Sequence, residues 1–167
     1  MNKAQRKNGE SIFADGGYFK VGVYSIVIAA VTLFAFLWTP VKYLSAEGMD
    51  CTVRNIINVL ADKNLDVLAC SQTLAFCTLA MAEVFHAIGM RDTETSIFKF
   101  NHLDNKVMLL AVAVGVIGQV LVTEVPFMMD IFGTVNMNLP AWGMVTVLGL
   151  VPLFVHEIIV IIKKMKK

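Results

Sequence analysis

The sequence predicts an all-α integral membrane protein, a four-helix bundle with both chain termini in the cytoplasm. Composition is the first observation behind this prediction, because 57% of the 167 residues are hydrophobic and only 16% are charged. Water-soluble domains usually carry about 25% charged residues. Long apolar runs and an uneven distribution of basic residues are the other two observations. Together they indicate that most of the chain lies in a lipid bilayer.

The apolar runs are long enough to cross a membrane as helices. A helix rises about 1.5 Å per residue, so about 20 residues cross the hydrocarbon core. Because no water is available there, the backbone N–H and C=O groups must pair within each segment. The expected spans are residues 21–40, 70–90, 107–126 and 142–162. They separate an N-terminal cytoplasmic segment, a membrane domain and a basic cytoplasmic tail, which are residues 1–20, 21–162 and 163–167.

The four runs differ in the polar residues that they contain. The first has no charged residue, and the second has Glu83 as its only charge. The third carries Glu124 near its far end, where water can reach it, so an interfacial position is expected. The fourth ends with His156 and Glu157, close to the basic tail. For these two residues a structural salt bridge or an interfacial anchor is the favoured interpretation.

The basic residues give the orientation, because loops rich in Lys and Arg stay in the cytoplasm. Of the 14 Lys and Arg residues, only Lys42, Arg54 and Lys63 lie in the first and third loops between spans. The others lie in the N-terminal segment, in the middle loop or in the tail. We therefore expect these parts on the cytoplasmic side of the plasma membrane. No cleavable signal peptide is expected, because the first apolar run is too long for one.

Residues 41–69 form the long connection on the expected outer side. Apolar residues from Val53 to Leu65 recur there at roughly helical spacing, which predicts a short amphipathic helix. We favour a helix that packs as a cap on the loop over one that binds the membrane surface. Cys51 and Cys70 both lie at or near this side, so the sequence is compatible with a disulfide and with two free thiols.

Small residues on the second and third spans predict close helix packing. They recur at one-turn or two-turn intervals, which lets helix backbones approach each other in lipid. They are Ala75, Ala82 and Gly89 on the second span, and Ala111, Gly115 and Gly118 on the third. We assign these residues to packing and not to chemistry.

Glu83 is the residue that most needs an explanation. A carboxylate inside a span is costly unless it is coordinated, protonated or hydrogen-bonded, and it usually faces the bundle interior or a hydrated cavity. Carboxylate oxygens suit hard cations such as calcium, which takes about 6–8 oxygen ligands, so one carboxylate cannot form a site alone. We predict that Glu83 binds a cation with ligands from elsewhere; a structural hydrogen bond to a neighbouring helix is the alternative. His86, one turn away, either tunes Glu83 or packs beside it.

Other functions find no support in the sequence. The segment HEIIV at residues 156–160 lacks the second His of a zinc-protease HExxH motif. The segment GGYFKVG lacks the spacing and the GK[ST] ending of a phosphate-binding loop. Nucleic-acid binding is not expected, because the terminal KKMKK fits an anchor at the inner membrane interface.

Several segments together resemble the C-terminal membrane domain of P-type cation-transporting ATPases, specifically the calcium-pump branch. VTEVPFMMDIFGTVNMNLPAWGMV is similar to the end of the ninth helix, the outer turn and the start of the tenth helix of that family. Four further segments resemble, in order, the lead-in to the seventh helix, the eighth helix, the link into the ninth and the end of the tenth. They are NGESIFADGGYFKVGVY, SQTLAFCTLAMAEVFHAIGMR, SIFKFNHLDNKVMLL and HEIIVIIKK.

This resemblance implies a role for Glu83. In calcium pumps of this family a glutamate of the eighth helix contributes oxygen to one calcium site, and the segment AEVFHAIG places Glu83 at that position. The resemblance leaves the choice between calcium and manganese open. The remaining ligands would lie on family helices that this chain does not contain. Glu124 departs from the family, which usually has an aromatic or apolar residue before the VPF-like turn.

The sequence lacks the DKTGT, TGE and GDGxND motifs of the family's cytoplasmic domains. By itself the chain is therefore expected neither to hydrolyse ATP nor to pump ions. Its expected partners are the lipid bilayer and the remaining helices and cytoplasmic domains of a pump. The chain is then either a truncated gene product or a separately encoded piece of that pump. Two alternatives stay open. One is a stand-alone four-helix membrane protein that acts as a regulatory or interaction subunit. The other is a small proton-coupled transporter with Glu83 as its carrier carboxylate.

Overall fold

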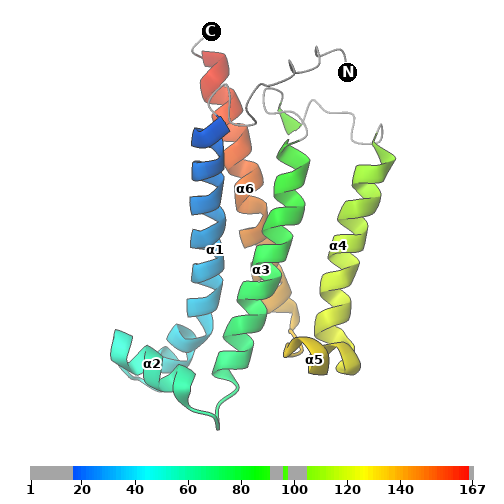
Figure 1. Ribbon diagram of the computed structural model, residues 1–167. Coiled ribbons are helices and arrows are strands. Elements are labelled where there is room, and N and C mark those ends of the chain that lie inside the picture. Colours follow the sequence, from blue (N-terminus) through cyan, green and yellow to red (C-terminus); the bar gives the residue numbers. More distant parts are fainter. Residues whose placement is uncertain (1–16, 91–95, 98–104, 166–167) are drawn as a thin grey trace.

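The computed structural model describes residues 17–90, 96–97 and 105–165, and within these ranges the chain is helical without any strand (Figure 1). Four of its helices are long and apolar enough to cross a membrane. These are α1 (Gly17–Ala46), α3 (Val67–Met90), α4 (Lys106–Glu124) and α6 (Leu139–Met165). Two short helices, α2 (Val53–Ala61) and α5 (Pro126–Phe132), lie in the connections. The all-α fold with four membrane helices is thus confirmed.

The long helices run side by side, and α3 lies at the centre of their packing (Figure 1). Helices α1 and α6 both pack extensively on α3 and also touch each other, whereas among the long helices α4 packs mainly on α3. The start of α1 and the end of α6 lie at one end of the bundle, here called the terminal end (Figure 1). Helices α2 and α5 lie at the opposite end, here called the α2 end.

Two helix boundaries differ from the predicted spans because of proline. The first span was predicted to end at Pro40, yet α1 continues to Ala46 with Pro40 buried inside it. Proline removes one backbone N–H from the hydrogen-bonding pattern of the helix. In this chain the helix nevertheless continues past Pro40, and Leu44 in its last turns packs among residues of α2 and α3. The third span was predicted to reach residue 126, but α4 ends at Glu124. Val125 is extended, as expected before a proline, and Pro126 begins α5.

Helix α2 confirms the amphipathic helix predicted in the long loop. The Thr52 hydroxyl oxygen caps it by accepting the Asn55 N–H at 3.2 Å. Val59 is buried against Leu44 of α1 and Val67 of α3. The helix therefore packs as a cap on the α2 end of the bundle, as favoured from the sequence.

Glycines let the helices approach closely, as predicted for Gly89 and Gly115. A Cβ atom at Gly89 would lie 3.1 Å from the Cγ atom of His156, and one at Gly115 would lie 2.8 Å from a methyl group of Val84. A Cβ atom at Gly118 would meet no atom within 4 Å, so the packing predicted for Gly118 is not made by the described helices of this chain. Gly149, which the sequence did not single out, makes a contact as close, 2.9 Å from Met81 Cβ.

The three cysteines are free thiols in this structure. Cys77 is buried among apolar residues of the main core, where it serves as a small packing residue. Cys51 is exposed, and its sulfur lies 3.8 Å from the Ser45 hydroxyl oxygen. Of the two arrangements open from the sequence, the structure thus has Cys51 and Cys70 unlinked.

Candidate functional site on the central helix

Glu83 lies on the side of α3 that the other helices of this chain leave open. One side of α3 is buried against α1 and α6, with Leu74, Met81 and Ala82 among its core residues. The opposite side carries an exposed row, here called the α3 stripe, made of Phe76, Leu79, Glu83 and Met90. Its members are three, four and seven residues apart, so they share one face of the helix. Glu83 is the single charge in this row.

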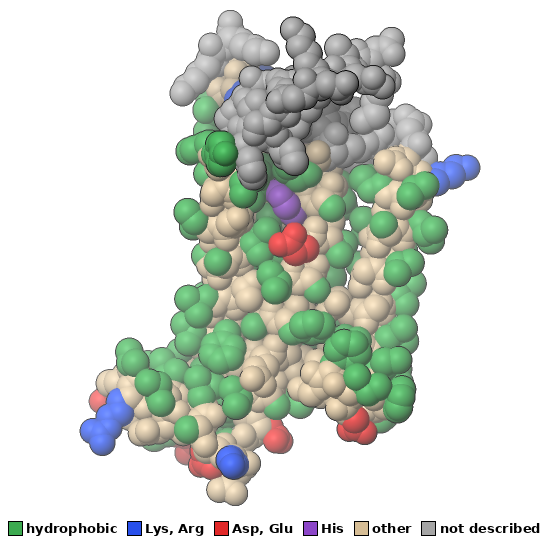
Figure 2. Space-filling model, in the orientation of Figure 1, with side chains coloured by type: hydrophobic (Ala, Val, Ile, Leu, Met, Phe, Trp, Pro, Cys, Tyr) green, Lys and Arg blue, Asp and Glu red, His purple; other side chains and the backbone are tan. Residues whose placement is uncertain are grey.

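The expectation that Glu83 faces the interior is therefore wrong for these four helices. Its side chain is exposed, and it forms no hydrogen bond or ion pair with any residue of the described ranges. No group of three or more His, Cys, Asp and Glu side chains suited to a metal ion occurs among those residues either. The alternative of a hydrogen bond to a neighbouring helix is equally unmet there. Figure 2 shows how largely hydrophobic the surrounding face is, with an acidic side chain beside a histidine well away from the α2 end.

His86 lies between Glu83 and helix α1. Its ring is half-buried and tilted against the Tyr24 ring of α1, with 4.2 Å between the ring centroids and 46° between the planes. It is close enough to Glu83 and to His156 to interact electrostatically with both. Its Nδ1 atom is buried and makes no hydrogen bond among the described residues. The ring is thus held by packing against α1, one turn from the carboxylate.

His156 belongs to the same cluster, which corrects the sequence interpretation. It is only 2% exposed, and its Nδ1 atom lies 3.3 Å from the Tyr24 hydroxyl. The interfacial anchor predicted for this residue is wrong, because His156 shares the buried face of α6 with Gly149, Pro152 and Val160. Tyr24, His86 and His156 therefore form one polar cluster, here called the Tyr–His cluster, between α1, α3 and α6 near the terminal end.

Glu157 forms hydrogen bonds to residues outside α6. Its carboxylate accepts the Ser96 O–H at 2.8 Å and the Ile97 backbone N–H at 2.5 Å. Ser96 and Ile97 lie between α3 and α4 in the sequence, so Glu157 ties these two residues to α6. Of the two predicted roles, the salt bridge is not formed among the described residues, because the carboxylate takes its hydrogen bonds from neutral donors; the interfacial anchor stays a prediction.

Glu124 is exposed at the α2 end, in agreement with the prediction that water reaches it. Its carboxylate accepts hydrogen bonds from the Asn136 side-chain amide and, at 3.3 Å, from the Trp142 indole N–H. It thereby joins the end of α4 to the start of α6. These two hydrogen bonds explain how an acidic residue is accommodated before the Val-Pro-Phe turn.

Four helices long and apolar enough to cross a bilayer, with one carboxylate exposed on the central helix, are the features of an integral membrane domain. Residues 1–162 match the family described as cation transporting ATPase, C-terminus. The chain therefore belongs to the C-terminal domain family of cation-transporting ATPases, as the sequence resemblance indicated.

Two curated bacterial proteins are similar to nearly the whole chain. Calcium-transporting ATPase 1 of Bacillus cereus is 30% identical over 165 residues, which are 98% of this chain and 18% of that protein. The calcium-transporting ATPase of Bacillus subtilis is 27% identical over 154 residues, which are 92% of this chain and 15% of that protein. A yeast relative, calcium-transporting ATPase 1 of Yarrowia lipolytica, is 32% identical over 62 residues, 37% of this chain and 7% of that protein. The chain thus spans less than a fifth of the length of the relatives it matches.

Proposed function

We propose that these 167 residues form the last four membrane helices of a P-type calcium-transporting ATPase, and that Glu83 supplies one oxygen ligand to the transported Ca²⁺. Family membership and the names of the relatives support the parent activity. In this arrangement α1, α3, α4 and α6 are the seventh to tenth helices of the pump. They buttress the transport helices, both termini lie in the cytoplasm, and the pump resides in the cell membrane.

The exposed position of Glu83 is the observation that carries this proposal. A carboxylate that faces lipid inside a span is costly, with about 2.5–3.5 kcal/mol on insertion scales when it lies at the helix centre. Because Glu83 forms no hydrogen bond or ion pair among the described residues of this chain, we infer that a protein surface or a hydrated site supplied by other helices covers it. The apolar members of the α3 stripe, such as Phe76 and Leu79, suit the same contact.

Binding of Ca²⁺ accounts for the exposed Glu83 carboxylate better than a catalytic role does. Ca²⁺ takes about 6–8 oxygen ligands, and carboxylates and carbonyls supply them. The other ligands then come from helices that the chain does not contain. His86 acts as a positioning residue: its packing on Tyr24 fixes the ring beside Glu83 and limits the rotamers of the carboxylate. ATP hydrolysis is left to cytoplasmic domains, whose motifs this sequence lacks.

Calcium activation of a complete pump that ends in these 167 residues tests the proposal. We expect Glu83→Gln to lower the apparent calcium affinity at least about tenfold, because the amide keeps the size of the side chain but loses its charge. Membrane insertion of the pump should be retained. Glu47→Gln, at an exposed site after α1, is the matched control and should leave calcium activation unchanged.

His86→Phe separates ligation from positioning. It keeps a flat ring against Tyr24, so we expect a shift in calcium affinity much smaller than that of Glu83→Gln. Normal calcium activation of the Glu83→Gln pump would overturn the ligand role. Proton-coupled efflux by the isolated chain, lost on Glu83→Gln, would instead establish the small transporter.

A further inference from the structure

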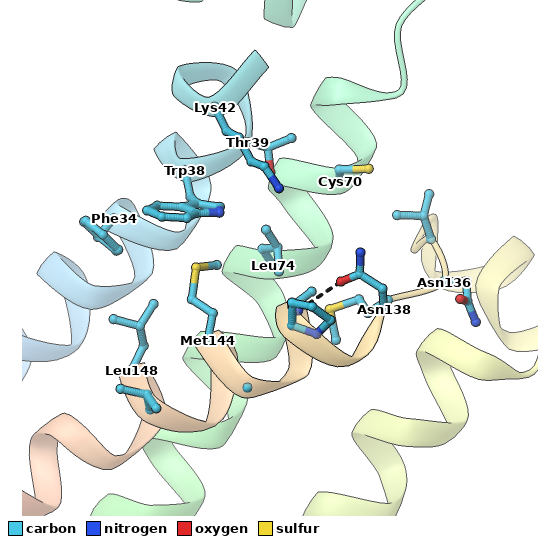
Figure 3. A pocket seen from close by; sticks show the side chains of 16 residues that line it. Phe34, Trp38, Thr39, Lys42, Cys70, Leu74, Asn136, Asn138, Met144 and Leu148 are labelled. Atoms are coloured by element: carbon cyan, nitrogen blue, oxygen red, sulfur yellow. Dashed lines mark hydrogen bonds between the residues drawn. The ribbon is translucent and has the colours of Figure 1, made fainter. Parts of the chain in front are cut away.

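A large groove opens between α1 and α6 in the half of the bundle nearest the α2 end (Figure 3). Its volume is about 660 Å³, within the range of about 300–1,000 Å³ that small-molecule sites usually have. Its floor is apolar and comes from three helices: Phe34 of α1, Leu74 of α3, and Met144 and Leu148 of α6. The proposed calcium site does not use it, because Glu83 and His86 are not among its lining residues.

Polar groups lie at one end of this groove only. Lys42 extends from α1 toward the space above Leu74, with Trp38 and Thr39 beside it (Figure 3). Lys42 forms no ion pair within the described ranges. On the opposite wall the Asn138 side-chain oxygen accepts the Ala141 N–H at 3.0 Å and so caps α6. The amide NH₂ group of Asn138 therefore remains as a donor at the same end.

The groove thus changes from charged to apolar along the bundle axis. Lys42 and Phe34 are eight residues apart on α1, which corresponds to about 12 Å along the helix. A phospholipid has the same order of groups, with a phosphate at the membrane interface and acyl chains deeper. An ammonium group on a flexible stem at that depth suits a phosphate, and an indole ring such as that of Trp38 is typical of the interface.

We propose that the groove binds one anionic phospholipid from the leaflet at the α2 end. Its phosphate contacts the Lys42 ammonium group and the Asn138 amide, and one acyl chain lies along Phe34, Leu74 and Met144. Charge complementarity favours this occupant over an apolar protein helix, which leaves Lys42 without a counter-charge, and over a zwitterionic lipid, whose phosphate is already balanced by the cationic group of its own headgroup. Water does not fill the floor, because an apolar cavity gives it too few hydrogen-bond partners.

Quenching of tryptophan fluorescence by brominated lipid tests this site. The full chain, carrying Trp142→Phe so that Trp38 alone is read, is reconstituted into mixed phosphatidylcholine and phosphatidylglycerol vesicles. Bromine is placed on the acyl chains of one lipid at a time. We expect phosphatidylglycerol to be enriched about fivefold beside Trp38 over its share of the bilayer, the preference expected of one basic side chain.

Two pairs of variants separate the headgroup contact from the groove itself. Lys42→Gln should remove the preference for phosphatidylglycerol, whereas Lys63→Gln, an exposed lysine after α2 that does not line the groove, should keep it. Gly143 lines the groove, and a Cβ atom there meets nothing within 4 Å. Gly143→Leu should therefore fill the groove and lower quenching by either lipid. Gly118→Leu on α4, equally open but remote from the groove, is its control.

Equal quenching of Trp38 by the two brominated lipids, in the protein with Lys42 and Gly143 unchanged, would overturn the proposal. A preference for phosphatidylglycerol that persists in Lys42→Gln would overturn it as well. Shielding of Trp38 from both lipids would mean that protein covers the groove, for example a second copy of the chain, and would overturn it as well.

Discussion

The Thr73 hydroxyl of α3 joins this central helix to the loop before α6. It donates to the Ala69 carbonyl at 2.8 Å and accepts the Val135 backbone N–H at 3.0 Å. Thr73 is only 1% exposed, so water cannot replace it as the partner of Val135. The hydrogen bond from Val135 fixes the loop that also carries Asn136 and Asn138, and hence one wall of the groove.

Thr73→Val should destabilise the bundle by about 1–3 kcal/mol, because it leaves the Val135 N–H without its acceptor at nearly constant side-chain volume. The free energy of unfolding in mixed detergent micelles, followed by circular dichroism, measures the effect. Thr146→Val is the matched control, because the Thr146 hydroxyl bonds only the Trp142 carbonyl of its own helix. If the two variants lose equal stability, the hydrogen bond to Val135 is not what matters.

Contact between α3 and α6 depends on Gly149. A Cβ atom at this position would lie 2.9 Å from Met81 Cβ and 3.2 Å from the Met81 carbonyl carbon. Gly149→Ala should therefore force the helices apart and cost about 1–3 kcal/mol, as overpacking of a tight contact usually does. Thermal unfolding in detergent is the measurement. Gly143→Ala, on the same helix but with nothing within 4 Å of its new Cβ atom, should be neutral or slightly stabilising.

Most of the helical architecture could be predicted from the sequence, because it follows from local composition. Spans of about 20 apolar residues have no structure other than a helix available in lipid. The boundary at Glu124 was missed by two residues because Pro126 starts a new helix, and the boundary near Pro40 because the proline does not end α1. In both places packing and turn geometry determine where the helix ends, and the hydropathy of the sequence carries no information about either.

The candidate site could be predicted only in part. The lone charge in an apolar run was enough to single out Glu83, but not the direction in which it points. That direction depends on which face of α3 is covered by α1 and α6, and the apolar character of α3 is nearly uniform around the helix. The burial of His156 against Tyr24, 132 residues away in the sequence, is likewise a tertiary contact with no local signal.

Glu157 should control the protection of the Ile97 amide against hydrogen exchange. Its carboxylate holds the Ile97 N–H at 2.5 Å, and Ile97 is only 7% exposed. Hydrogen bonds to charged groups contribute about 1.5–3 kcal/mol, so Glu157→Ala should speed hydrogen exchange of the Ile97 amide by about 10-fold to 100-fold. Mass spectrometry with fragmentation resolves this amide. Ser96→Ala removes only the second hydrogen bond of Glu157 and should leave most of the protection at Ile97. Unchanged exchange in Glu157→Ala would show that burial alone protects this amide, and that Glu157 does not tie Ile97 to α6.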